Sequence, residues 1–275
     1  MVAAGYRMKY GKDYIHTYSP TAFAVTIRLF LAIVAAKRLH LRAIDVCTAF
    51  LYGEMPKEHQ VYCEPPPGIE VPDGHVLLLK KRLYGLKNAP RIWFLTLVEF
   101  LTGLQFTQSE HDPCLFYSKG EGVYAVLVFV VDDIMFASDS KQFNDAVVAA
   151  FRARFKIKDM GQPKYILGMH IEYDQATGRL ALTQERYIKA VAAKFGFDNS
   201  RPKTMPHNTT KLHQGMSGTA CGTTAKMKNK PYRQLIGCIL YCCLTPPDIC
   251  VIISILAKYS SDPGVPMWNA LYHLM

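Results

Sequence analysis

The stretch Ala125-Val126-Leu127-Val128-Phe129-Val130-Val131-Asp132-Asp133-Ile134-Met135-Phe136-Ala137 decides the fold. Two adjacent carboxylates interrupt an otherwise apolar run whose flanks are rich in Val, Phe and Ile. Each flank is too short for a stable helix, so the run predicts two buried strands joined by a tight hairpin, with Asp132 and Asp133 at its bend. Aspartate also favours ordinary turns, because its side chain bonds nearby backbone groups, and this alternative stays open for the pair taken alone.

A third acid lies in a second apolar segment, Leu41-Arg42-Ala43-Ile44-Asp45-Val46. The segment predicts a strand with Asp45 near its end, before the chain turns at Thr48-Ala49, and strand pairing could bring Asp45 beside the hairpin. Crowded carboxylates repel one another and raise their pKa values unless divalent cations supply compensating charge. Hard oxygen ligands select Mg²⁺ or Mn²⁺. The three acids are therefore candidate metal ligands.

The segments around these acids resemble the reverse transcriptase domain of copia-type long-terminal-repeat retrotransposons, and the resemblance extends over nearly the whole chain. Its most specific part is the string Leu83-Tyr84-Gly85-Leu86-Lys87-Asn88-Ala89-Pro90-Arg91, which stands in register with both aspartate motifs. The match to this string begins at Leu79, and the other matching segments are residues 11–14, 45–53, 64–68, 112–116, the Asp132-Asp133 hairpin, 158–161, 165–169, 182–184 and 231–237.

This resemblance implies an α+β fold, the right hand of polymerases, with fingers, a palm of antiparallel sheet and helices, and a helical thumb. Residues 1–178 would form the fingers and palm, and residues 179–275 the thumb with a C-terminal helical extension. A Thr-, Gly-, Ser- and Lys-rich stretch at about 206–230 has no hydrophobic periodicity, which predicts a flexible loop within the thumb.

The implied activity is that of an RNA-directed DNA polymerase, which extends a primer with deoxynucleoside triphosphates by a two-metal mechanism. Asp45, Asp132 and Asp133 match the catalytic carboxylates of the family, which hold two Mg²⁺ or Mn²⁺ ions. Phe50 matches the ring that lies beneath the incoming sugar and excludes a 2′-hydroxyl. The alternative for Phe50 is an ordinary core phenylalanine on an apolar turn.

Two further segments match nucleic-acid contacts of the family. Tyr84, Gly85 and Lys87 would lie near the incoming nucleotide, although Tyr-Gly is also ordinary loop sequence before a helix. The segment Leu167-Gly168-Met169 resembles the primer grip, a hairpin that holds the primer terminus over the metals. An ordinary strand bend at a glycine is the alternative there.

Some positions depart from the family pattern. Ala4 and Phe23 stand where the family commonly has lysines that meet the triphosphate, a role that Arg7, Lys9 or Arg28 could take instead. Because of these departures, the alternative function is a catalytically inactive retroelement remnant that retains nucleic-acid binding. A palm-type nucleotidyl cyclase shares the aspartate chemistry but leaves the string at residues 83–91 unexplained.

The charge distribution is uneven. The net charge is +10, and residues 179–233 contain 11 Lys and Arg against two acids, so this stretch holds +9 of the +10. A basic segment that follows an acidic centre suits a thumb that grips a duplex through its phosphates, and a solvated basic loop is the alternative. The expected partners are an RNA or DNA template-primer duplex, deoxynucleoside triphosphates, and the integrase and ribonuclease H of a longer Pol polyprotein.

The sequence shows no convincing targeting signal or membrane span. Residues 21–36 include Arg28 and predict an amphipathic helix, and residues 235–257 are broken by Thr245-Pro246-Pro247-Asp248, which predicts two packed helices. The cysteines lack zinc-site spacing, so reduced thiols are expected. These features predict an intracellular protein rather than a secreted or membrane protein, and the family resemblance implies cytoplasmic virus-like particles and also the nucleus.

Overall fold

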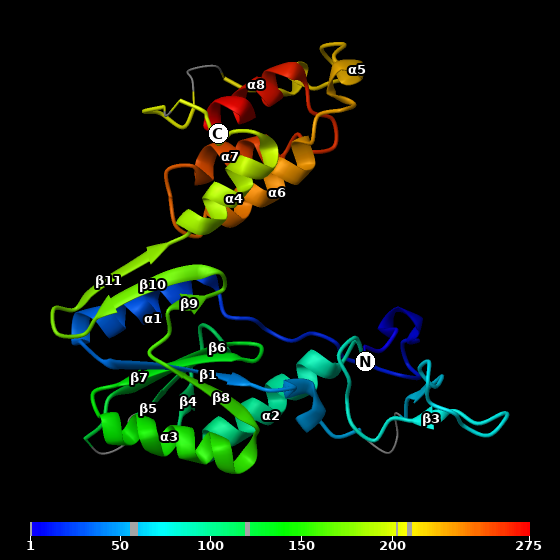
Figure 1. Ribbon diagram of the computed structural model, residues 1–275, viewed down its shortest axis with the longest axis vertical. Coiled ribbons are helices and arrows are strands. Elements are labelled where there is room, and N and C mark those ends of the chain that lie inside the picture. Colours follow the sequence, from blue (N-terminus) through cyan, green and yellow to red (C-terminus); the bar gives the residue numbers. More distant parts are fainter. Residues whose placement is uncertain (1, 56–59, 119–121, 202, 208–210) are drawn as a thin grey trace. The chain divides into compact units, whose positions relative to one another are not determined.

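The computed structural model describes residues 2–55, 60–118, 122–201, 203–207 and 211–275. The chain divides into two compact units, each with its own core (Figure 1). Unit 1 comprises Met1–Lys164 and Glu172–Leu180, and unit 2 comprises Tyr165–Ile171 and Ala181–Met275. The first unit contains the large sheet, and the second is mostly helical.

A six-stranded antiparallel sheet forms the centre of unit 1, with the strand order β4-β5-β6-β7-β1-β8. Val, Ile and Phe dominate β6 and β7, because branched and aromatic side chains pack well on a pleated surface, and almost every residue of these two strands is buried. The strands are β1 (His40–Val46), β4 (Thr107–Gln108), β5 (Leu115–Ser118), β6 (Ala125–Val130), β7 (Asp133–Ser138) and β8 (Ile157–Gly161).

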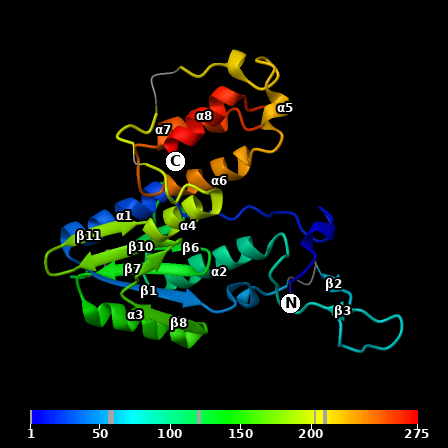
Figure 2. The same cartoon turned by 45° about the horizontal axis from the view of Figure 1, so that its top comes forward.

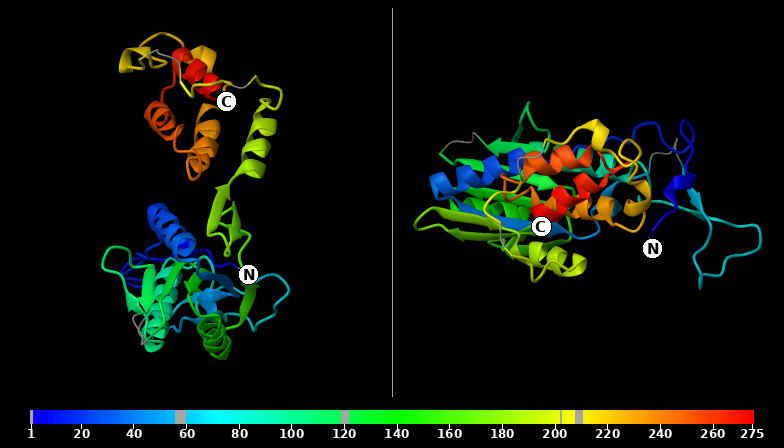
Figure 3. Two further views of the ribbon diagram at one scale, coloured as in Figure 1. Left: turned by 90° about the vertical axis from the view of Figure 1, so that its left-hand side faces the viewer. Right: turned by 90° about the horizontal axis from the view of Figure 1, so that it is seen from above.

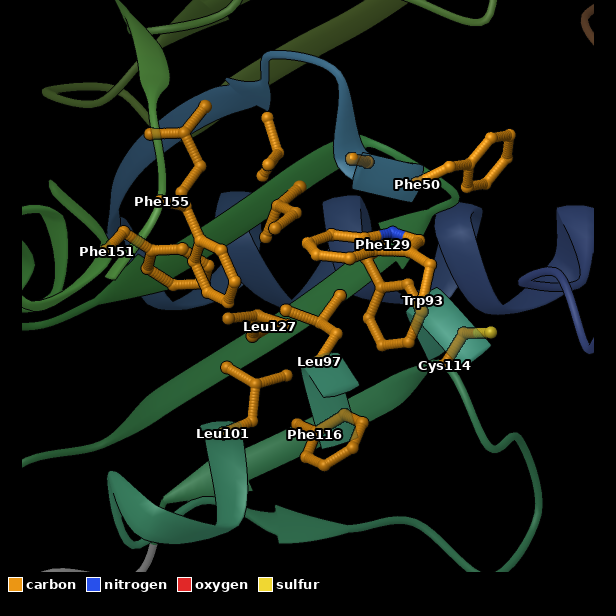
Figure 4. Packing of buried hydrophobic residues seen from close by; sticks show 14 of the residues in the cluster. Phe50, Trp93, Leu97, Leu101, Cys114, Phe116, Leu127, Phe129, Phe151 and Phe155 are labelled. Atoms are coloured by element: carbon orange, nitrogen blue, oxygen red, sulfur yellow. The ribbon is translucent and has the colours of Figure 1, made fainter. Parts of the chain in front are cut away.

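Helices cover both faces of this sheet. Helix α1 (Ala24–Lys37) lies on one face, and α2 (Ala89–Gly103) and α3 (Lys141–Arg154) lie on the other (Figures 1 and 3). Burial on both faces explains why the middle strands are continuously apolar rather than alternating. The core between the sheet and the helices is strongly aromatic and includes Trp93, Phe116, Phe129, Phe151 and Phe155 (Figure 4).

The remaining elements of unit 1 are short. Strands β2 (Tyr62–Cys63) and β3 (Leu77–Leu78) form a two-stranded ribbon that lies apart from the large sheet (Figure 2). A 3₁₀ helix, η1 (Gly5–Arg7), lies near the start of the chain, and a second, η2 (Ala49–Tyr52), follows β1. Three further strands, whose residues are divided between the two units, form a small sheet in the order β11-β10-β9, with bounds β9 (Tyr165–Ile166), β10 (Met169–Asp174) and β11 (Arg179–Thr183).

Unit 2 is built from helices around an aliphatic core. Leu235, Ile253, Met267 and Leu271 are buried there. Helix α4 ends at Gly196, which adopts the left-handed conformation (φ +76°) that closes many helices. The helices are α4 (Glu185–Phe195), α5 (Thr224–Met227), α6 (Tyr232–Cys242), α7 (Cys250–Ala257) and α8 (Val265–Leu274), with a 3₁₀ helix η3 (Gln214–Met216).

The predicted α+β class is confirmed, with antiparallel sheet and helices in unit 1 and helices in unit 2. The helices of the described chain include none that is both long and apolar enough to cross a membrane.

Residues 206–230, predicted as a flexible loop, include the short helices η3 and α5, and residues 208–210 lie outside the described chain. The Asp262 carboxylate accepts hydrogen bonds from the backbone N–H of Thr219, at 2.9 and 3.1 Å, and Thr223 N–H donates to Gly218 O at 2.8 Å. The local bond from Thr223 and the long-range bond from Thr219 to Asp262 together give turns to a polar stretch without hydrophobic periodicity.

Candidate active site

Asp45 and Asp133 face each other across the pairing of β1 with β7. The register aligns Ile44 with Ile134 and then Asp45 with Asp133, at the point where both buried strands end. Directly opposite side chains of antiparallel strands have Cβ atoms about 5 Å apart. Both aspartates are half-buried. The structure therefore brings together two of the acids that the sequence singled out.

Asp132 lies in the two-residue turn between β6 and β7, whose last pair is Val130 with Asp133. The backbone N–H of Val46 donates to the carbonyl oxygen of Asp132 at 3.1 Å, so the turn is attached to the end of β1. The hydroxyl of Tyr84 donates to Oδ2 of Asp132 at 3.2 Å. All three acids thus lie at one end of the central strands.

The charges of neighbouring side chains influence the ionisation of Asp45 and Asp133. Burial raises the pKa of Asp45, the charge of Asp132 raises it further, and Lys158 on the neighbouring strand β8 lowers it. Burial also raises the pKa of Asp133, and the charges of Asp132 and Asp45 act in the same direction. Since like charges at one place disfavour ionisation, the site has a surplus of negative charge that a bound cation would relieve.

The donor set suits a hard divalent cation, because carboxylate oxygens are the ligands that Mg²⁺ and Mn²⁺ prefer. Within the described residues, no group of three or more His, Cys, Asp and Glu side chains is arranged to hold a metal ion. Asp132 is instead hydrogen bonded to Tyr84. This hydrogen bond engages Oδ2 of Asp132, one of the two oxygens that could bind an ion.

Phe50 and Tyr84 form an aromatic pair beside these acids. Their ring centroids are 4.3 Å apart, with an angle of 50° between the ring planes. Phe50, from η2, belongs to the buried core (Figure 4), whereas Tyr84 is 36% exposed. Burial of its hydroxyl raises the pKa of Tyr84, and the charge of Asp132 adds to the shift. The pair links the hydrophobic core to the Asp132 carboxylate.

Gly85 has a structural reason to be glycine. Its φ is +96°, and a side chain there would overlap the carbonyl group of Ala3. The N–H of Ala3 donates to Tyr84 O at 2.7 Å, so the N-terminal segment packs directly on this loop. The backbone at Gly85 therefore keeps the Tyr84 ring next to Phe50.

Two cations, Lys87 and Arg28, were proposed from the sequence as nucleotide contacts. The ammonium group of Lys87 donates to Met8 O and to the Tyr14 hydroxyl, both at 3.2 Å, and lies 4.9 Å from the centre of the Tyr14 ring. Arg28 is exposed on α1. Neither residue contributes to the pKa shifts of Asp45 and Asp133. Lys87 therefore connects the loop that contains Tyr84 and Gly85 to the N-terminal segment at Met8 and Tyr14.

Leu167 and Gly168 form the turn of the β9–β10 hairpin in unit 2, between Ile166 and Met169. Both turn residues have positive φ, +44° and +71°, which is the signature of a tight type I′ hairpin turn. The hydroxyl of Tyr241, on α6, donates a hydrogen bond to Leu167 O. Helix α6 therefore holds the turn that was proposed as the primer grip.

Sequence reasoning assigned no role to Lys158, Trp93 or Tyr241. Lys158 is the pairing partner of Asp45 on β8, and its charge favours the ionised carboxylate. Trp93 and Tyr241 each donate a hydrogen bond to the carbonyl of a turn residue. No local pattern marks these residues, because their partners come from elements distant in the sequence.

The chain is similar to known proteins over its whole length. A family model described as reverse transcriptase (RNA-dependent DNA polymerase) matches residues 1–209. The chain is 31% identical over 276 residues to the retrovirus-related Pol polyprotein from transposon TNT 1-94 of Nicotiana tabacum, a match that covers 98% of this chain and 21% of that protein. It is 32% identical over 279 residues to the retrovirus-related Pol polyprotein from transposon RE2 of Arabidopsis thaliana, covering 100% of this chain and 18% of that protein.

The chain therefore spans about a fifth of the length of these two curated relatives. Among solved structures, a foamy viral protease-reverse transcriptase in complex with double-stranded DNA is similar at 12% identity with a TM-score of 0.37, over 82% of this chain and 36% of that chain.

Proposed function

The chain belongs to the reverse transcriptase (RNA-dependent DNA polymerase) family, and from this premise we propose that it extends a primer with deoxynucleoside triphosphates on an RNA or DNA template. The observation that supports this most directly is the pairing of Asp45 with Asp133 and the position of Asp132 in the adjoining turn. Three carboxylates at one end of the central strands, two of them with raised pKa values, suit the binding of divalent cations for phosphoryl transfer.

The proposed metal ligands are Asp45, Asp132 and Asp133, and the proposed cofactor is a pair of Mg²⁺ or Mn²⁺ ions. When bound, such ions lower the pKa of a primer 3′-hydroxyl and neutralise charge on the phosphates. The protein's own contribution is alignment: the strand register holds Asp45 opposite Asp133, and the bond from Val46 holds the turn. Alignment and charge compensation account for most of the rate in phosphoryl transfer.

The aromatic pair of Phe50 and Tyr84 is the proposed platform for the incoming nucleotide. The Tyr84 hydroxyl bonds to Asp132, where the triphosphate would meet the metals, and the Tyr84 ring packs on Phe50. A bulky ring beneath the sugar leaves no room for a 2′-hydroxyl, which would favour deoxynucleotides. In this proposal Gly85 keeps Tyr84 in place, and Lys87 supports the loop from behind rather than contacting a phosphate.

The template-primer duplex would bind through its phosphates to the basic segment at residues 179–233, and the turn at Leu167 and Gly168 would hold the primer end. The same proposal places this chain within a longer intracellular Pol polyprotein, together with integrase and ribonuclease H.

Primer extension tests the polymerase proposal. We expect the chain to incorporate deoxynucleotides with Mg²⁺ or Mn²⁺, and Asp132→Asn to abolish incorporation. Asp73→Asn is the matched control, because Asp73 is exposed in a turn of unit 1 and should not affect the rate. No incorporation by the parent chain, with salt-sensitive duplex binding intact, would instead identify an inactive nucleic-acid-binding remnant.

A further inference from the structure

The turn that carries Asp132 contains a strained residue. Only Val131 and Asp132 join β6 to β7, and Val131 has a φ of +59°. A β-branched side chain disfavours this left-handed conformation strongly, so such a residue persists only where surrounding contacts hold it in place. The hairpin itself would be satisfied by glycine at this position.

A contact of this kind comes from helix α2. The indole Nε1–H of Trp93 donates to the carbonyl oxygen of Val131 at 2.7 Å. Trp93 is only 1% exposed, and its ring packs edge-on against Phe155, with 5.4 Å between ring centroids. Tyr52 also lies beside it, with 6.3 Å between centroids, and the ring of Tyr52 packs in turn on Phe155, at 5.0 Å. The donor is therefore fixed in direction as well as in distance.

The two carbonyl groups of the turn are thus held from two directions. Trp93 holds that of Val131, and the backbone N–H of Val46 holds that of Asp132, at 3.1 Å. The bond from Val46 is a backbone hydrogen bond that extends the pairing of β1 with β7, so it needs no particular side chain. The bond from Trp93 depends on a side chain that reaches the turn from a helix packed on the face of the sheet.

We propose that Trp93 is a positioning residue for the carboxylate site: its indole N–H holds Val131 in the left-handed conformation and thereby sets the directions of Asp132 and Asp133. The inference rests on the proposed polymerase function, because positioning has a consequence only if these carboxylates bind metal. Trp93 touches no reacting atom in this scheme and acts entirely through the turn. Misplacement of catalytic groups by about 1 Å can cost on the order of 100-fold in rate.

The most selective test replaces Trp93 by β-(3-benzothienyl)alanine, which keeps the size and shape of the indole but has sulfur in place of N–H. We expect kcat for primer extension to fall about 10- to 100-fold, with KM for the deoxynucleotide within about twofold of the parent value. Mn²⁺ binding, followed by electron paramagnetic resonance, should weaken in the same variant. Trp268→Phe, in unit 2, is the control for removal of a tryptophan and should leave all three quantities unchanged.

A second variant separates positioning from packing. Trp93→Phe should lower both kcat and the thermal midpoint, because it also leaves a cavity. In a Val131→Gly background, where the turn is no longer strained, Trp93→Phe should lower kcat by much less than it does in the parent chain. An equal fold-loss of kcat in both backgrounds would show that Trp93 only packs, and would overturn the proposal.

Two experimental outcomes separate the role of Trp93 from the polymerase activity of the chain. Unchanged kcat and Mn²⁺ binding in the benzothienyl variant of an active parent chain would overturn the role of Trp93 alone. A parent chain that binds Mn²⁺ but incorporates no nucleotide would overturn the polymerase proposal, and weaker Mn²⁺ binding by the benzothienyl variant would still support the role of Trp93.

Discussion

The hydroxyl of Tyr84 donates a hydrogen bond to the carboxylate of Asp132, and the ring of the same tyrosine packs against Phe50. Tyr84 therefore connects the proposed metal site to the proposed nucleotide platform. Because the hydrogen bond engages one oxygen of Asp132, a metal ion would have to compete with Tyr84 for this carboxylate.

Removal of the Tyr84 hydroxyl should make metal binding easier. We expect Tyr84→Phe to lower the Mg²⁺ concentration for half-maximal primer extension by about three- to tenfold, since one charge-assisted hydrogen bond no longer competes. Tyr84→Ala removes the ring as well and should raise KM for the deoxynucleotide instead. A Mg²⁺ titration of both variants measures the difference, and an unchanged Mg²⁺ requirement in Tyr84→Phe would contradict the competition.

The size of Phe50 should control the choice between deoxynucleotides and ribonucleotides. We expect Phe50→Val to raise the incorporation of CTP relative to dCTP by at least tenfold, because a smaller side chain leaves room for a 2′-hydroxyl. Phe50 is also part of the core, so the variant should lose about 2–4 kcal/mol of stability. Phe129→Val, a core change on β6, controls for stability. An equal gain in CTP incorporation by Phe129→Val would contradict the proposal that the size of Phe50 excludes ribonucleotides.

Tyr241 should matter for primer retention. Tyr241→Phe removes the donor to Leu167 O and leaves a turn with a leucine at positive φ less well held. We expect faster dissociation of the template-primer duplex, by about three- to tenfold, at an unchanged rate of single-nucleotide addition on duplex already bound. Dissociation in the presence of a trap duplex measures this. The neighbouring Tyr187→Phe is the control for loss of a phenolic hydroxyl on the same aromatic pair.

The buried side chain of Arg82 should lower the free energy of unfolding. Its side chain is 1% exposed, and its Nε and Nη1 have no hydrogen-bond partner among the residues that the structure describes. Burial lowers the pKa of the guanidinium group, because it penalises the charged form. We expect Arg82→Met to raise the free energy of unfolding by about 1–3 kcal/mol in urea titrations. A loss of stability would show that Arg82 has a partner essential to the fold.

Unlike Arg82, Arg42 is paired with carboxylates, and this pairing should make the stability of the fold depend on pH. Its guanidinium group donates to Asp159 at 2.7 and 3.1 Å and also pairs with Asp145. The hydrogen bond from Arg42 lowers the pKa of Asp159 below its usual value. A lowered folded-state pKa contributes stability that is present above the unfolded-state pKa, about 4, and is lost as the pH falls through the folded-state value.

Arg42→Met should therefore be less stable than the parent chain by about 2 kcal/mol at pH 7. The difference should shrink progressively below about pH 4, where the unfolded chain begins to take up protons. Urea titrations from pH 7 to pH 3 measure the gap between the two chains. A gap that stays constant to pH 3 would exclude Asp159 as the group responsible.

Much of unit 1 was predictable because its elements have strong local signals. The apolar runs that flank Asp132 and Asp133 form β6 and β7, and the segment that ends at Val46 forms β1, as the sequence indicated. The sequence indicated only that strand pairing could bring Asp45 near Asp133. It did not predict the register, because register depends on which strands become neighbours. The short helices within residues 206–230 were also not predicted, because hydrophobic periodicity gives no information about the hydrogen bonds on which they depend.

The sequence by itself determined the secondary structure around the acids, the family resemblance and the choice of three carboxylates as candidate metal ligands, because apolar runs and short motifs are local properties of the chain. Only the tertiary structure decided which side chains hold those carboxylates in place. Trp93 reaches Val131, Tyr84 reaches Asp132 and Lys158 lies beside Asp45 across separate elements. Such contacts exist only after the helices and strands have packed, so no pattern along the chain could reveal them.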